Sequence, residues 1–259
     1  MKTYFFKYQG AGNDFILIDD RHDQYSEMDS ALISNLCDRR FGIGSDGLIL
    51  IKKSKVADLW IDFMNPDGSR SFCGNGSRCG LLFAKKLGMI QGESCTFEAV
   101  DGVHTGILIA GGARISMHQV SAIEAHEDGN FVYTGSPHLI LPVTDLNTMD
   151  IKGLGAAIRY SPSYADEGVN VNFVKDLGPD SLGIRTYERG VEDETLACGT
   201  GVTAAALVHA RLHGLENGTI QVKALGGDLK VSFVKDREGF KDIYLEGPAE
   251  EVFCGEIAL

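Results

Sequence analysis

Much of the chain alternates between hydrophobic and polar residues, which is the pattern of strands that bury one face. Segments rich in Val, Ile and aromatic residues recur at 48–53, 59–64, 106–110, 113–120, 169–174, 182–188, 219–224, 229–234 and 242–247. Residues 250–259 have the character of one more strand, which we expect to return to the first half of the chain. The pattern therefore predicts a protein built largely from β-strands.

Two segments have a helical pattern instead, residues 77–88 and residues 202–214. Each ends in a glycine, Gly88 or Gly214, where a helix C-terminal cap favours that residue. Both are short and largely apolar, so we expect each to lie buried in the middle of its half of the chain. The expectation is an α+β protein of two similar halves, each a sheet wrapped around one central helix.

A weak internal duplication supports this division into halves. Gly12 and Gly135 each stand, with a polar residue, just before an apolar strand-like run. Further on, Cys-Gly-polar-Gly occurs twice, beginning at Cys73 and at Cys198, and each copy leads into one of the predicted helices. Gly12 precedes Cys73 by 61 residues, and Gly135 precedes Cys198 by 63. Two unrelated motifs that recur at nearly equal separation indicate a repeated structural unit.

The halves are expected to meet where the strand pattern gives way to polar residues near 119–122. Residues 1–119, completed by a returning strand at about 248–259, would form an N-terminal domain that carries Cys73. Residues 120–247 would form a C-terminal domain that carries Cys198, with the active site in the cleft between the two domains.

Composition limits the classes of function. The net charge of −12 disfavours binding to nucleic acid or to an anionic membrane, since both partners attract basic surfaces. No apolar run approaches the roughly 18 residues of a membrane span, and the first residues become polar too early for a signal peptide. We therefore expect a cytoplasmic protein without nucleic-acid or membrane partners.

Six cysteines lie at positions 37, 73, 79, 95, 198 and 254. In a reducing compartment they would remain thiols, and a chain of this length needs no disulfides to hold its core. Cys73 and Cys79 lack a second pair of ligands at zinc-finger spacing, so structural zinc is not expected there. The cysteines outside the repeat are expected to be buried structural residues, and His209 and His213 on the second helix are also expected to be structural.

A cysteine at the start of a helix has a chemical consequence. The unpaired N–H groups and the partial positive charge of a helix N-terminus stabilise a thiolate. Adjacent glycines let the backbone approach an anion such as a carboxylate. Neither glycine cluster matches the nucleotide-binding motifs, and no lysine stands in a recognisable Schiff-base site.

Two such cysteines on duplicated halves suit the inversion of an amino-acid α-carbon. One thiolate would remove a proton from one face while the other thiol delivers a proton to the opposite face, and reversal only exchanges their roles. The helix N–H groups would meet the charge that develops on the substrate carboxylate. The sequence thus predicts an epimerase or racemase that needs neither metal nor organic cofactor.

The motifs GNDFILID (12–19), FMNPDGS (63–69), CGNGSRC (73–79), VNVNF (169–173) and YERGVEDETLACGTG (187–201) resemble those of the diaminopimelate epimerase family in order and spacing. The resemblance implies an α+β fold of two pseudo-symmetric domains, each a mostly antiparallel sheet around a central helix. It also implies an isomerase that converts LL-2,6-diaminopimelate to its meso form for lysine and peptidoglycan biosynthesis. No metal or cofactor is implied, and a homodimer is expected.

The resemblance implies roles for particular residues. Cys73 would donate and Cys198 would accept the proton in the LL-to-meso direction, with Glu188 and His138 beside the reacting centre in support of catalysis. The implied substrate-binding residues are Asn13, Asn65, Gly74, Asn75, Asn170, Glu188, Arg189, Gly199 and Thr200. A fork-shaped guanidinium such as that of Arg189 suits a substrate carboxylate.

Two positions depart from some family members, and three alternatives remain open. Ser136 replaces an asparagine and Gly47 a glutamine, so the reaction is more firmly indicated than the substrate. The first alternative is a racemase of another amino acid on the same fold. The second is a thiol–disulfide redox protein, although the usual Cys-x-x-Cys is missing. The third is a cysteine hydrolase that uses Cys198 with a histidine.

Overall fold

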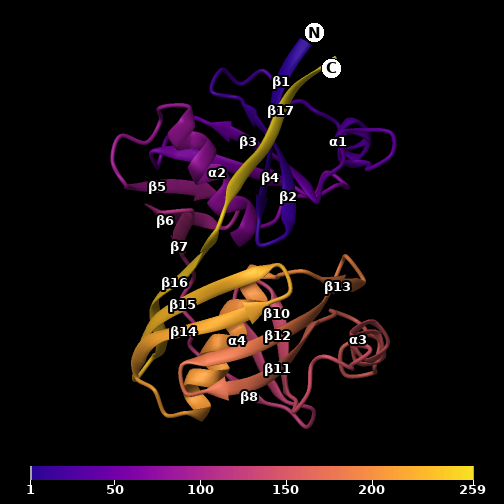
Figure 1. Cartoon of the computed structure of the whole chain (residues 1–259), viewed down its shortest axis with the longest axis vertical. Coiled ribbons are helices and arrows are strands. Elements are labelled where there is room, and N and C mark those ends of the chain that lie inside the picture. Colours follow the sequence, from indigo (N-terminus) through magenta and orange to yellow (C-terminus); the bar gives the residue numbers. More distant parts are fainter. Residues whose placement is uncertain (1, 259) are drawn as a thin grey trace. The chain divides into compact units, whose positions relative to one another are not determined.

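The computed structural model describes residues 2–258, which divide into two compact units. Unit 1 contains the residues up to Ile115 and those from Gly247 onward, and unit 2 is Ser116–Glu246. Figure 1 shows strands around one central helix in each unit, α2 (Gly74–Lys86) in unit 1 and α4 (Gly199–Leu212) in unit 2. The α+β fold class predicted from the sequence is confirmed.

Unit 1 is a mixed sheet in which most neighbouring strands are antiparallel. Two pairs are parallel, β2 with β3 and β4 with β5. Because the last strand pairs with the first, the end of the chain belongs to this unit. The hydrogen-bonded order is β17 (Glu250–Ala258), β1 (Lys2–Gly10), β2 (Asn13–Asp19), β3 (Gly47–Lys52), β4 (Leu59–Met64), β5 (Ser94–Ala99), β6 (Gly102–Ile109) and β7 (Gly112–Ser116).

Unit 2 repeats this topology strand for strand. Its parallel pairs are β10 with β11 and β12 with β14, at the positions equivalent to those of unit 1. A short strand, β13 (Asp193–Thr195), adds an antiparallel partner to β12. The order is β8 (Glu124–Ala125), β9 (Asn130–Tyr133), β10 (Pro137–Pro142), β11 (Asn170–Gly178), β12 (Ser181–Glu188), β14 (Asn217–Ala224), β15 (Gly227–Asp236) and β16 (Gly239–Pro248).

The central helices begin three residues earlier than the sequence pattern predicted, at Gly74 and Gly199. Their ends agree with the prediction, because Gly88 and Gly214 follow them with left-handed φ angles of 74° and 67°. Both helices are mostly buried within their own units. The glycine-rich motifs are therefore the first helical turns.

Two further helices were not predicted, α1 (Ser30–Cys37) and α3 (Ile151–Arg159). Each follows the first strand of a parallel pair, and each is capped by an aspartate, Asp29 or Asp150, whose carboxylate accepts a backbone N–H of the first turn. They pack on hydrophobic clusters of their sheets. Strands such as β3, in which every residue is buried, are thus covered on both faces.

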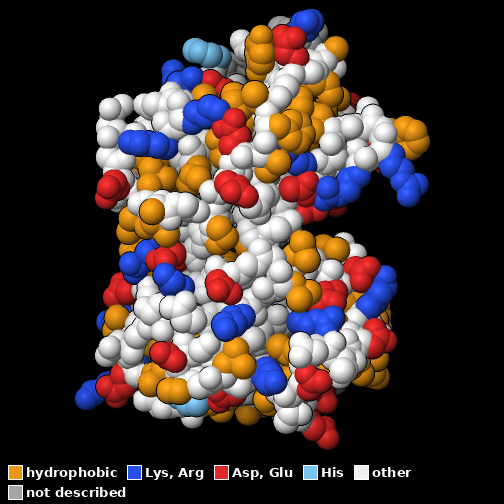
Figure 2. All heavy atoms as spheres, viewed as in Figure 1, with side chains coloured by type: hydrophobic (Ala, Val, Ile, Leu, Met, Phe, Trp, Pro, Cys, Tyr) orange, Lys and Arg blue, Asp and Glu red, His pale blue; other side chains and the backbone are white. Residues whose placement is uncertain are grey.

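Acidic and basic side chains are interspersed on the face of the two units that Figure 2 draws. None of the helices in residues 2–258 combines the length and the apolar character needed to cross a membrane.

Candidate active site

Cys73 occupies the N-cap of α2 in extended backbone conformation, with φ −127° and ψ 107°. Its Sγ accepts a hydrogen bond from the Gly76 N–H at 3.3 Å. Ser77 N donates the first intrahelical bond, to the Cys73 carbonyl oxygen at 2.8 Å. The N–H groups of Gly74 and Asn75 therefore lie ahead of the helical ladder, where they can bind an anion.

A buried guanidinium accompanies this thiol. Arg78 is 0% exposed and donates to the Gly74 carbonyl oxygen at 3.3 Å and to Asn75 Oδ1 at 2.9 Å. Burial lowers the pKa of Arg78 to about 10, while the charges of Cys79 and then Cys73, when ionised, act in the opposite direction. Arg78 thus remains protonated at neutral pH, and its charge favours the thiolate form of Cys73.

Asn13 and Asn75, both predicted as substrate-binding residues, contact one another. Asn75 Nδ2 donates to Asn13 Oδ1, and Asn13 Nδ2 donates to Asp46 Oδ2 at 3.0 Å. Together with the Arg78 bond to Asn75, these contacts link Asp46 to the buried guanidinium. The chain of amides fixes the turn between β1 and β2 against the first turn of α2.

Asn65 makes its contacts inside its own turn. Its Nδ2 donates to the carbonyl oxygen of Ser69 and to the hydroxyls of Ser69 and Ser71, each at 3.1 Å. Its backbone N–H also donates to the Ser69 carbonyl oxygen, at 2.8 Å. In this state the side chain stabilises the loop that leads from β4 to Cys73, as asparagines in turns commonly do.

Cys198 is the N-cap of α4 with a backbone closely similar to that of Cys73, φ −110° and ψ 112°. It is 8% exposed, and its Sγ lies 3.4 Å from the hydroxyl of Thr200. Val202 N donates the first intrahelical bond, to the Cys198 carbonyl oxygen. The N–H groups of Gly199 and Thr200 thus occupy the same anion-binding position as those of Gly74 and Asn75 in unit 1.

His138 lies next to Thr200 and contacts its hydroxyl. Its Nε2 is 2.9 Å from Thr200 Oγ1, and its Nδ1 is 3.2 Å from the amide nitrogen of Asn172. Since that amide nitrogen can only donate, Nδ1 accepts and Nε2 carries the proton. The neutral histidine donates to the Thr200 hydroxyl, which is left to donate to Cys198 Sγ.

The histidine is neutral over the whole working pH range. It is 0% exposed, and burial, with the charge of Arg189 as a second cause, lowers the pKa of His138 to about 3. The geometry therefore supports a positioning role for His138, which acts through Thr200, rather than proton exchange with the substrate.

Sequence reasoning missed Asn172, whose side chain joins three strands of unit 2. Besides His138 it bonds to the carbonyl oxygens of Leu139 and Asn170, and its Oδ1 accepts the Thr186 hydroxyl at 3.0 Å. A Cβ on Gly201 would lie 2.5 Å from Asn172 Oδ1, so only glycine lets the helix approach this amide. The sequence did contain a signal for Asn172. Residues two apart in a strand lie on the same face, so Asn172 shares a face with Asn170, which was predicted to bind substrate.

Asn170, Glu188 and Arg189 lie on neighbouring segments of unit 2. Asn170 Nδ2 donates to the Ser136 hydroxyl at 2.8 Å, and its Oδ1 accepts the Arg189 backbone N–H at 2.9 Å. Glu188 Oε2 accepts the hydroxyl of Thr195 at 2.9 Å. The Arg189 guanidinium is exposed and donates to a backbone carbonyl oxygen. An amide, a carboxylate and a cation thus gather at the end of β12.

The remaining cysteines differ from this pair. Burial raises the pKa of Cys79 to about 12 and that of Cys95 to about 11, and it also raises the pKa of Cys37. Cys254 is exposed, so the prediction that every cysteine outside the repeat is buried is wrong for this residue. No disulfide joins any of the six cysteines, all of which lie in the described part of the chain. Cys73 and Cys198 are the two thiols at N-caps of central helices, so each unit contains one thiol surrounded by N–H and O–H donors and suited to proton transfer.

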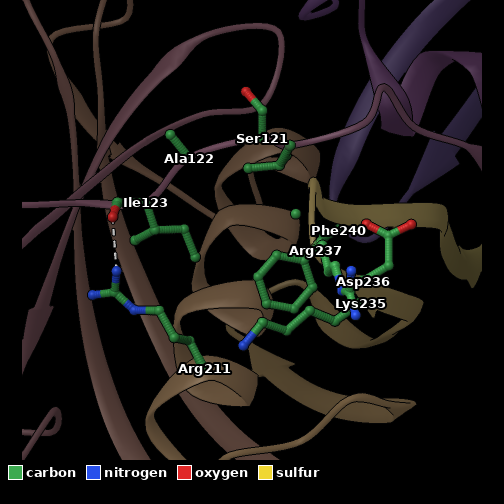
Figure 3. Close-up of a pocket in the computed structure, with 10 residues that line it drawn as sticks. Ser121, Ala122, Ile123, Arg211, Lys235, Asp236, Arg237 and Phe240 are labelled. Carbon is green, nitrogen blue, oxygen red and sulfur yellow. Dashed lines mark hydrogen bonds between the residues drawn. The ribbon is translucent and has the colours of Figure 1, made fainter.

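A hollow elsewhere in unit 2 is lined by none of the predicted site residues. It encloses about 200 Å³ and lies between the 120–123 segment, α4 and the turn after β15 (Figure 3). Its cations are Arg211, Lys235 and Arg237. The Arg211 guanidinium donates hydrogen bonds to the carbonyl oxygen of Ile123, at 2.7 Å, and to Asn130 Oδ1.

Comparison with known proteins gives matches along nearly the whole chain. The family model of diaminopimelate epimerase matches residues 5–119 and 130–252. The diaminopimelate epimerase of Flavobacterium psychrophilum is 46% identical over 255 residues, which cover 98% of this chain and 98% of that protein. The diaminopimelate epimerase of Chlorobaculum tepidum is 41% identical over 261 residues and covers 96% of this chain and 99% of its own length.

Solved structures share the fold at much lower identity. A phenazine biosynthesis protein of the PhzF family from Bacillus anthracis has a TM-score of 0.72 at 17% identity, with 100% of both chains covered. A hydroxyproline epimerase from Agrobacterium vitis has a TM-score of 0.68 at 16% identity and covers 100% of this chain and 93% of its own. These proteins share the fold of this chain, but at such low identity the similarity carries no information on the substrate.

Proposed function

The chain belongs to the diaminopimelate epimerase family, and on that premise we propose that it interconverts LL- and meso-2,6-diaminopimelate with Cys73 and Cys198 as the two acid–base groups. The observation that carries the proposal is the pair of matching N-caps. In each unit a cysteine with nearly the same φ and ψ begins the central helix of the same topology. One thiol on each unit is what a two-base inversion requires.

In the LL-to-meso direction, the Cys198 thiolate takes the α-proton and becomes a thiol. The Cys73 thiol then gives its proton to the opposite face of the carbon and becomes the thiolate. The reverse reaction starts from this second protonation state, so no other group must be reset.

The α-proton of an amino acid is only weakly acidic, so the anionic intermediate needs stabilisation. The N–H groups of Gly74, Asn75, Gly199 and Thr200 supply it at the substrate carboxylate, because they precede the hydrogen-bonded ladders of α2 and α4. They are in place before the reaction, so no reorganisation is needed as charge develops.

The second amino-acid end of diaminopimelate does not react and needs its own ligands. Arg189 offers a guanidinium for the distal carboxylate, and Glu188 offers an acceptor for an ammonium group. Asn13, Asn65 and Asn170 complete the polar contacts. Asn170 supports this role because its side chain bonds to the Arg189 backbone, which ties the cation to β11, and to Ser136 just before β10.

The family also suggests a compartment, an oligomeric state and a metabolic role for this enzyme. It acts in the cytoplasm as a homodimer, without metal or organic cofactor, and its product serves lysine and peptidoglycan biosynthesis. The pH dependence of kcat/KM is bell-shaped and belongs to the thiol pair jointly. His138 does not contribute to it, because the low pKa of this histidine keeps it neutral.

The test follows the conversion of LL-diaminopimelate by the reduced protein without added metal or pyridoxal phosphate. Formation of the meso isomer supports the proposal. Turnover of histidine or glutamate with none on diaminopimelate would instead favour a racemase of another amino acid, to which the serine at position 136 gives some weight. Activity that requires a Cys73–Cys198 disulfide would favour a redox protein, whereas the epimerase loses activity on oxidation and regains it on reduction.

A further inference from the structure

A second cluster of polar side chains lies in unit 2 at the far end of α4 from Cys198. Asp176, near the end of β11, and His209 and His213, at the end of α4, each present one donor atom, and these atoms lie within 4.8 Å of one another. None of the three belongs to the proposed active site. We propose that they form a binding site for a divalent transition-metal ion of the zinc type.

The histidines have the spacing of a helical chelate. Residues four apart face the same side of a helix, and the rings of His209 and His213 have centroids 4.3 Å apart. The His213 backbone N–H still donates to the His209 carbonyl oxygen at 3.0 Å, so helical geometry holds across both positions. The pair therefore offers two imidazole nitrogens from one rigid element.

Asp176 supplies the third donor from a different element. Its Oδ2 lies 2.8 Å from His213 Nε2, and its Oδ1 accepts the Gly178 backbone N–H at 2.7 Å. His209 Nε2 lies 3.0 Å from the Gly178 carbonyl oxygen, so the same strand end holds both side chains. In tetrahedral zinc sites neighbouring donors stand about 3.3 Å apart, as the usual metal–ligand distances require. A small opening of the aspartate–histidine contact therefore makes room for the ion.

The surroundings favour a cation. The last carbonyl groups of α4 carry the partial negative charge of a helix C-terminus. Arg211 lies between the two histidines in sequence but turns away from them, since residues two apart do not share a helix face. Figure 3 shows its guanidinium bonded to the Ile123 carbonyl oxygen.

The chemistry of the donor set specifies the kind of ion. Two imidazoles and one carboxylate suit zinc, cobalt, nickel or copper rather than calcium or magnesium, which prefer oxygen ligands. Asp176 and His213 are both exposed, so the ion has access from solvent and a water completes the coordination. Binding would join the end of α4 to the end of β11.

Metal titration of the full chain tests this site separately from catalysis. Cys73, Cys198 and Cys254 are replaced by serine so that accessible thiols do not compete for the ion. After treatment with a chelator, Zn²⁺ binding is measured by competition with a chromophoric chelator, and Co²⁺ binding is measured by visible absorption. We expect one ion per chain and a higher thermal unfolding midpoint in the presence of Zn²⁺.

Substitutions identify the ligands. His213→Ala and Asp176→Asn each weaken the binding at least about tenfold and abolish the thermal shift. His126→Gln is the matched control, because His126 Nε2 also lies near a carboxylate, Glu124, at 3.6 Å. It leaves the affinity unchanged. Equal affinity in the parent protein and in both ligand variants, or no binding by the parent protein, would overturn the proposal.

Discussion

The two half-sites share a backbone and differ in what surrounds the thiol. Cys73 and Cys198 are N-caps with φ angles of −127° and −110° and ψ angles of 107° and 112°. Each precedes the buried central helix of its unit, and the two helices occupy equivalent places in the order of strands along the chain. The duplicated fold thus fixes where both sulfur atoms stand on their units.

The surroundings are charged in one unit and neutral in the other. The buried guanidinium of Arg78 interacts electrostatically with Cys73, and amides link this guanidinium to Asp46. At Cys198 a hydroxyl and a neutral imidazole take its place, Thr200 and His138. A duplicated frame can therefore set two protonation equilibria independently, because the backbone around the two thiols is shared while the neighbouring side chains differ.

Removal of either thiol has the largest expected effect. Cys73→Ala and Cys198→Ala each lower the rate of epimerisation at least about a thousandfold, since each removes an acid–base group. The residual α-proton exchange separates the halves. Cys73→Ala retains some exchange of the LL isomer, whereas Cys198→Ala retains some exchange at the D centre of the meso isomer. Solvent-exchange NMR measures both, and full epimerase activity in either variant would refute the two-base scheme.

Loss of the Thr200 hydroxyl has the next largest effect. Thr200→Val leaves the buried Nε2–H of His138 without its acceptor and removes the donor to Cys198. We expect kcat to fall about 10- to 100-fold, as the cost of an unmet buried polar group implies, with a smaller change in KM.

Thr203→Val is the control for this substitution. Thr203 is buried in the same helix, but its hydroxyl donates to the Gly199 carbonyl oxygen rather than to the thiol region. Its kcat and the pH profile should stay near those of the parent enzyme. If both variants lose kcat equally, the Thr200 hydroxyl has no special relation to Cys198.

A smaller effect is expected at the charged half-site. Arg78→Lys keeps a cation but loses the fork that bonds to Gly74 and Asn75. The pKa of Cys73 should rise by about one unit, because the charge moves away from the sulfur. The rate of alkylation of Cys73 by iodoacetamide, followed against pH by mass spectrometry, measures the shift.

Arg21→Lys is the matched substitution at the other end of the same helix, where Arg21 donates to the Leu87 carbonyl oxygen. It should leave the alkylation profile of Cys73 unchanged. An unchanged profile in Arg78→Lys as well would mean that the guanidinium does not stabilise the thiolate.

The smallest effect concerns stability at low pH, and it is confined to unit 1. Burial opposes ionisation of Asp14, but hydrogen bonds from Arg39 and Lys7 outweigh it and lower the pKa of Asp14 from 3.8 to about 2. The depressed pKa contributes about 2 kcal/mol to stability above pH 3.8, which is lost as the pH falls from there towards 2.

Amide hydrogen exchange in β1 and β2 reads out this contribution, with β10 and β11 of unit 2 as the internal reference. Asp14→Asn should reduce the acid sensitivity of exchange in β1 and β2. Equal acid sensitivity of the two strand pairs in the parent protein would contradict the assignment.

Much of this frame was predictable because it rests on local patterns. Alternation predicted the strands, terminal glycines predicted the ends of α2 and α4, and the repeated Cys-Gly motifs predicted thiols at helix starts. Helix α3 was missed because Gly153 and Gly155 disfavour a helix. Packing explains why position 155 is a glycine, since a Cβ at Gly155 would lie 2.3 Å from Tyr187 Cβ.

The charged and polar side chains that surround the two thiols could not be predicted from local patterns. An arginine on a helix is usually exposed, and the burial of Arg78 depends on strands that are distant in the sequence. His138 was expected beside the reacting centre, but the position of Thr200 between it and Cys198 emerges only from the packing of α4 against β10. Tertiary packing determines such contacts, so no local pattern reports them.

The initial reaction in heavy water tests whether two thiols act on opposite faces of one carbon. LL-diaminopimelate is mixed with the reduced enzyme, and the deuterium in the residual substrate and in the meso product is measured before equilibrium. Two bases predict one deuterium in nearly every meso molecule and almost none in the remaining LL substrate. Meso product that retains the original α-hydrogen would show that a single base removes and returns the proton, and it would contradict the account.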